Sequence, residues 1–168
     1  MSSHRDSGAV ILGATPSLPG RVWAEAARYA ALFGSELIVA HVDVTRFVTY
    51  EDPDGIAHSA PIDLTRAAAS HELERVQAAA EEHLASTGVD WSIRTLVGDP
   101  AMALKGLADD LDAAVIVVGT RRRGFGETMR EFFTGSVAAR LAHRQYRPVL
   151  VVPLQESVAE GDDDPWRE

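Results

Sequence analysis

The sequence of 168 residues contains no cysteine, which excludes disulfide bonds, thiol catalysis and metal sites built on thiolates. It also contains no long apolar run. The longest, residues 113–118 (AAVIVV), is far too short to cross a bilayer. No apolar stretch of signal-peptide length follows the N-terminal residues. These absences predict a cytoplasmic protein whose fold is held together by packing alone.

Positive charge is also scarce, because 16 Lys and Arg residues face 25 Asp and Glu residues, giving a net charge of −9. This balance repels phosphate backbones and disfavours a general binder of nucleic acids or of anionic membranes. The hydrophobic content of 46% is ordinary for a globular chain and permits a real core. We expect one domain over residues 9–153. A disordered segment, residues 1–8, precedes it, and an acidic disordered tail, residues 154–168, follows it.

Segments with strand and helix patterns alternate along this domain. Short apolar or alternating runs predict strands at residues 9–12, 36–42, 91–97, 113–118 and 149–152. Apolar stripes at helical spacing predict helices at residues 22–33, 69–84 and 100–111, and a last helix that begins near residues 135–136. Gly34 is expected to cap the first helix and Asp99 to cap the third. Residues 43–61 and 119–135 are expected to be long connections, the second with one helical turn near Thr128.

This alternation predicts an α/β fold, because right-handed crossovers place the helices on both faces of a parallel sheet. The expected architecture is a doubly wound five-stranded parallel sheet with strand order 3-2-1-4-5. Residues 91–97 should form an exposed strand at or near an edge, and residues 113–118 a central strand. Ligands of such sheets bind beyond the carboxyl ends of the strands, where the winding direction reverses. Residues 13–17, 119–126 and 135–137 are expected to converge there.

The converging segments suit an anion. Residues 135–137 open a helix, where free backbone N–H groups and the positive end of the helix dipole favour negative charge. Gly119, Gly124 and Gly126 would let the preceding loop fold closely over a phosphate. Both features have an ordinary alternative, since most helix starts bind nothing and a flexible loop also contains glycine.

Two common nucleotide-binding motifs, the P-loop and the Rossmann fingerprint, are excluded by the residues at their required positions. The G-x-x-x-x-G spacing at Gly119 is followed by Phe125 and Gly126, where a P-loop requires Lys and then Ser or Thr. A Rossmann fingerprint fails because Met129 stands where the third glycine belongs.

Catalytic and metal-binding motifs are not found either. No zinc motif surrounds His71, and no G-x-S-x-G elbow occurs. His41, at the end of a strand, is the histidine best placed for function, but a hydrogen-bonded structural histidine is the commoner case. An efficient enzyme is therefore not expected, because even slow hydrolysis would need a water-activating group and the sequence offers no clearly placed one.

Four segments carry a family resemblance: VILGATPS, LIVAHV, GDPAMALKGLADDLDAAVIVVGT and TGSVAARLAHRQYRPVLVVP. Over residues 9–153 the chain resembles the universal stress protein family. The resemblance implies a stress-response regulatory module that binds ATP or AMP between the first and fourth strands, with magnesium only alongside a nucleotide. It also implies a homodimer through residues 149–152, an apolar edge that self-pairing would cover.

The resemblance implies nucleotide-binding positions at Ala14, Thr15, Val42, Val118, Gly119, Gly124, Gly126, Gly135, Ser136 and Val137. Arg121, Arg122 and Arg123 are candidate phosphate contacts, or alternatively a solvated basic patch. The chain departs from the family pattern at Thr15, where the family has an aspartate, and at Arg122, where it has a glycine. The connection from Gly119 to Gly135 is also three residues longer. Two hypotheses therefore stay open: a module that binds ATP or AMP, and a dimeric interaction module of the same family that binds no nucleotide.

Overall fold

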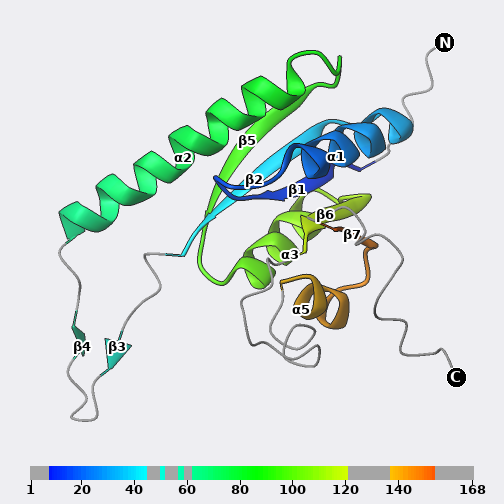
Figure 1. Cartoon of the computed structure of the whole chain (residues 1–168). Helices are drawn as coiled ribbons and strands as arrows, with labels where there is room; N and C mark the ends of the chain where they lie inside the picture. Colours follow the sequence, from blue (N-terminus) through cyan, green and yellow to red (C-terminus); the bar gives the residue numbers. More distant parts are fainter. Residues whose placement is uncertain (1–7, 45–49, 52–56, 59–61, 121–136, 154–168) are drawn as a thin grey trace, which may run out of the picture.

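The computed structural model describes residues 8–44, 50–51, 57–58, 62–120 and 137–153 (Figure 1). The strands are β1 (Val10–Ala14), β2 (Leu37–Asp43), β3 (Tyr50–Glu51), β4 (Ala57–His58), β5 (Trp91–Val97), β6 (Val115–Gly119) and β7 (Val149–Val152). The helices are α1 (Gly20–Phe33), α2 (Ile62–Leu84), α3 (Pro100–Asp110) and α5 (Val137–Arg144). None of these helices is long and apolar enough to span a membrane.

Five strands form one sheet in the order β5-β2-β1-β6-β7, and every neighbouring pair is parallel. This confirms the predicted doubly wound sheet and its strand order. The half-exposed strand β5 lies at one edge, as its alternating pattern predicted. The apolar strand β6 is an inner strand, with β1 at the centre of the sheet.

Two helices cover each face of the sheet. Strand residues such as Leu12 and Val39 pack against α1 and α2 in one buried cluster. Alternate residues such as Ile11 and Ile38 pack against α3 and α5 in a second cluster. Figure 1 shows the sheet between α2 on one side and the pair α3 and α5 on the other. Alternating side chains on strands buried at both faces explain why these strands read as continuous apolar runs.

Both predicted helix caps are confirmed. Gly34 adopts a φ of 63° at the end of α1, a conformation that costs glycine little because it has no Cβ. Asp99 precedes α3, and its carboxylate accepts a hydrogen bond from the backbone N–H of Met102 at 3.1 Å.

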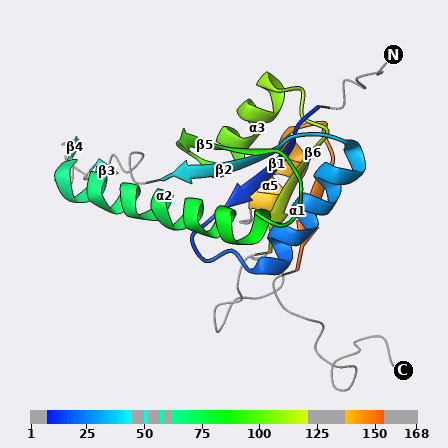
Figure 2. The ribbon, with the colours of Figure 1, turned by 90° about the horizontal axis from the view of Figure 1, so that it is seen from above.

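The connection expected over residues 43–61 lies between β2, which ends at Asp43, and α2. It contains the antiparallel pair β3 and β4, and α2 begins at Ile62 instead of at residue 69, where the predicted helix began. Figures 1 and 2 show the N-terminal part of α2 projecting beyond the sheet. The apolar stripe of the sequence begins only at Ala69, so helical periodicity did not reveal these first turns.

Candidate functional site

An open cleft with a volume of about 1290 Å³ lies at the carboxyl ends of β1, β2 and β6. Its described lining includes residues 13–19 at the end of β1 and in the turn beyond it, residues 40–42 of β2, residues 118–120 at the end of β6, and residues 137–140 of α5. The strand order reverses between β1 and β6, so the cleft occupies the position where open α/β sheets hold their ligands. Segments distant in the sequence meet here because all five strands run in the same direction.

Six of the predicted site residues line this cleft: Ala14, Thr15, Val42, Val118, Gly119 and Val137. Thr15 is exposed at the turn after β1. Gly124, Gly126, Gly135, Ser136 and the arginines Arg121, Arg122 and Arg123 lie outside the described residues. The cleft therefore brings together the strand-end part of the predicted site with the first described residue of α5.

His41 is buried on the cleft wall, with 3% of its surface exposed. Its Nδ1 lies 3.4 Å from the carbonyl oxygen of Ala14 on the neighbouring strand. Its Nε2 lies 3.9 Å from Oε2 of Glu72 on α2 and has no hydrogen-bond partner within the described structure. The sequence indicated a hydrogen-bonded histidine at a strand end, and it gave no reason to place Glu72 beside it.

Arg140 also lines the cleft, one helical turn beyond the start of α5. Its guanidinium forms an ion pair with Asp99 at 2.7 Å, which joins α5 to the first turn of α3. The hydrogen bond from Arg140 lowers the pKa of Asp99 below the ordinary value for an aspartate, and the bond from the Met102 N–H adds to this. Sequence analysis missed Arg140 because an arginine on a short polar helix carries no signal of its own.

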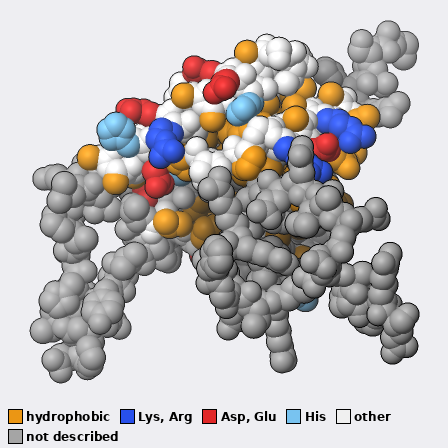
Figure 3. Space-filling model, viewed as in Figure 1, with side chains coloured by type: hydrophobic (Ala, Val, Ile, Leu, Met, Phe, Trp, Pro, Cys, Tyr) orange, Lys and Arg blue, Asp and Glu red, His pale blue; other side chains and the backbone are white. Residues whose placement is uncertain are grey.

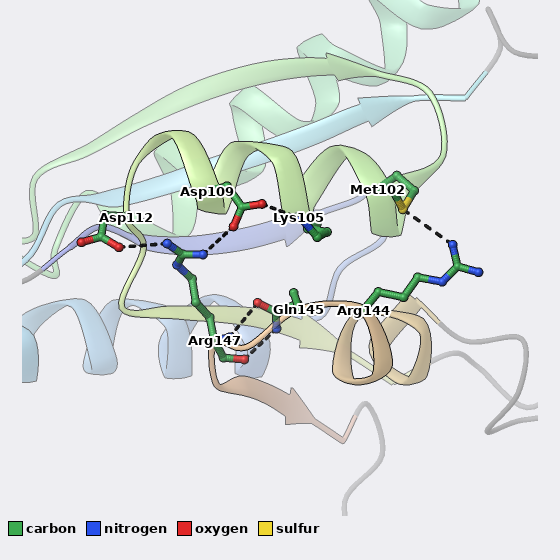
Figure 4. Close-up of polar contacts among 7 residues, drawn as sticks. All are labelled: Met102, Lys105, Asp109, Asp112, Arg144, Gln145 and Arg147. Carbon is green, nitrogen blue, oxygen red and sulfur yellow. Dashed lines mark hydrogen bonds and ion pairs between the residues drawn. The ribbon is translucent and has the colours of Figure 1, made fainter.

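A second polar cluster lies at the other end of α3 and has a structural role (Figure 4). The guanidinium of Arg147 donates to Asp109 at 2.6 Å and to Asp112 at 2.9 Å. Lys105 also donates to Asp109, and this hydrogen bond is the largest cause of the lowered pKa of Asp109. These contacts tie the segment before β7 to α3, away from the cleft.

Neither the face drawn in Figure 3 nor the described histidine, aspartate and glutamate residues indicate a second site. Figure 3 shows acidic and basic side chains interspersed with apolar ones on the face in view, without a broad area of one charge sign. Within the described ranges, no group of three or more histidine, aspartate or glutamate residues could hold a metal ion. The cleft is therefore the feature that best matches a binding site.

Comparisons with known proteins agree with this geometry. The chain is 29% identical to a universal stress protein solved in complex with cAMP, with a TM-score of 0.53 over 89% of this chain and 98% of that chain. A universal stress protein from Archaeoglobus fulgidus in complex with dAMP is 21% identical, with a TM-score of 0.56 over 87% and 97% of the two chains. A universal stress protein family member from Burkholderia pseudomallei is 20% identical, with a TM-score of 0.62 over 89% and 98%.

No curated protein gives a significant match. The model of the universal stress protein family matches residues 10–153, which span all of the described strands and helices. The chain therefore belongs to the universal stress protein family.

Proposed function

We propose that this protein is a cytoplasmic regulatory module that binds AMP or ATP in the cleft between β1 and β6. The main support for this proposal is the cleft, which is lined by the carboxyl ends of β1, β2 and β6 and by the first described turn of α5. The cAMP complex of the structure that is 29% identical supports an adenine nucleotide as the ligand.

In the proposed complex the nucleoside lies near Ala14, Thr15, Val42, Val118 and Gly119. The phosphates lie toward Val137 at the start of α5. Backbone N–H groups at a helix start have no partner inside the helix and stabilise negative charge. Gly124, Gly126, Gly135, Ser136 and residues 121–123 belong to the same proposed phosphate region on the sequence pattern alone.

Isothermal titration calorimetry with AMP, ATP and cAMP, with and without magnesium, tests this proposal. We expect one nucleotide per chain and a weak dependence on magnesium, because Thr15 supplies no carboxylate for a hard cation. Thr15→Asp should strengthen ATP binding in magnesium by roughly tenfold, since a charge-assisted contact contributes about 1.5–3 kcal/mol.

Thr15→Val is the matched control, because it removes the hydroxyl and adds no charge. It should leave the magnesium dependence unchanged. If the folded wild type binds none of the three nucleotides, the second hypothesis gains support. One observation favours a dimeric interaction module that binds no nucleotide. Thr15 is exposed in the cleft at the position where the family has an aspartate.

We further propose that the protein is a homodimer in which β7 pairs with β7 of a second copy. β7 forms one edge of the sheet, and Val151 is 42% exposed there. A short apolar edge strand is an aggregation hazard unless another chain covers it, and a two-fold pairing covers both copies equally.

Val151→Lys should convert this dimer to monomers, because two charges would face each other across the two-fold axis. Light scattering after size exclusion measures the mass against the 18.1 kDa of one chain. Val97→Lys is the matched control, since Val97 is 47% exposed at the end of the opposite edge strand β5. A monomeric wild type would refute the dimer.

A further inference from the structure

The unpartnered nitrogen of His41 indicates what part of a ligand the cleft recognises. A buried polar atom usually has a hydrogen-bond partner, because an unpaired one loses its hydrogen bonds to water without replacement. His41 Nε2 is the exception among the described side chains, and the residue is 3% exposed on the wall of the cleft. A ligand group in the cleft would satisfy this atom.

The hydrogen bond at the other ring nitrogen sets the character of Nε2. The carbonyl oxygen of Ala14 can only accept, so the 3.4 Å contact is a hydrogen bond when Nδ1 carries the proton. In the neutral ring Nε2 is then an acceptor with a free lone pair. The group that satisfies it must be a donor.

Glu72 places a second acceptor beside the first. Its Oε2 lies 3.9 Å from His41 Nε2, which is too far for a direct hydrogen bond. The separation suits one group that donates to both atoms. The Glu72 side chain is 49% exposed, so it sits at the open side of the cleft while His41 forms the buried wall.

We propose that His41 and Glu72 together read an amino group on the ligand, and that they select adenine over purines with an oxo group at the same position. An exocyclic amino group carries two N–H donors, whereas an oxo group is an acceptor and would face two acceptors. This inference rests on the proposed nucleotide function and adds a specificity to it. In this proposal Glu72 of α2 supplies a carboxylate to the site, whereas the turn after β1 has Thr15 where the family has an acid.

Calorimetric affinities for AMP and for inosine monophosphate, which has the oxo group, test the selection. The wild type should prefer AMP by roughly tenfold or more, because a site that pairs a donor rejects the analogue that lacks it. Glu72→Gln should bring the two affinities close together, since an amide can either accept from an amino group or donate to an oxo group.

Glu74→Gln is the matched control, because it removes the same charge from a 72% exposed side chain of α2 that does not line the cleft. It should keep the wild-type preference. His41→Asn provides a second variant, and its binding of inosine monophosphate reports that the cleft remains folded.

The outcomes separate the two proposals. If neither nucleotide binds the folded wild type, the nucleotide function itself fails. If both bind the wild type equally, the function stands and the role of His41 and Glu72 is overturned. If the preference for AMP persists in both Glu72→Gln and His41→Asn, the amino group is read elsewhere and the inference is again overturned.

Discussion

Replacement of Trp23 by alanine is expected to lower the free energy of unfolding by about 3–5 kcal/mol. Trp23 on α1 is completely buried in the cluster between α1, α2 and the sheet. Its indole N–H donates to the carbonyl oxygen of Leu18 at 3.2 Å, and its ring stacks on His83 of α2 with centroids 5.8 Å apart. Alanine would leave a cavity and an unpaired carbonyl where two helices meet the sheet. Urea denaturation followed by circular dichroism measures the change.

Trp91→Ala is the matched control, since Trp91 lies half-buried on the edge strand β5. It should cost clearly less than the change at Trp23. A loss below about 1 kcal/mol at Trp23 would contradict the expectation, because the surrounding helices would then have closed the cavity.

Leu141→Ala should lower the free energy of unfolding by about 2–5 kcal/mol and weaken ligand binding in the cleft. Leu141 is the buried residue of α5 and belongs to the cluster that contains Ile116 and Val118 of β6. α5 has only eight residues, and Leu141 is the one that is fully buried against the sheet. Thermal unfolding with and without AMP measures both effects.

Leu32→Ala removes the same atoms from a side chain that is 68% exposed on α1. Its effect should stay within about 0.5 kcal/mol, as for most surface substitutions. Equal losses at Leu32 and Leu141 would show that α5 is held by something other than this contact.

The sheet was predictable because the pattern of apolar and polar residues in each strand indicates whether that strand is buried on both faces or lies at an edge. The apolar runs of β1, β2 and β6 are buried on both faces, and the mixed pattern of β5 matched its place at an edge. Right-handed crossovers then left few ways to order them. Predicted caps at Gly34 and Asp99 also match, because local backbone geometry selects those residue types.

The contact between His41 and Glu72 could not be predicted in the same way. Glu72 is one of several acidic residues on the polar surface of α2, and the sequence does not say which of them faces the end of β2. That choice depends on how α2 is rotated about its axis, which Val76, Ala80 and Leu84 settle by packing on the sheet. A sequence pattern indicates which side of a helix is buried, but not which polar residue at its margin meets a given strand.

The pairing of β1 has a consequence for the order in which the chain assembles. Val10 pairs with Leu37, near in the sequence, and also with Val115, which is separated from it by most of the chain. The entropic cost of closing a loop rises with its length, so the contacts between β1 and β2 form more readily than those between β1 and β6. The wall of the cleft built from β1 and β2 can therefore form early, while the wall from β6 and α5 arrives late. A ligand that touches both walls would bind only after β6 has paired with β1, and once bound it would slow the separation of these two strands.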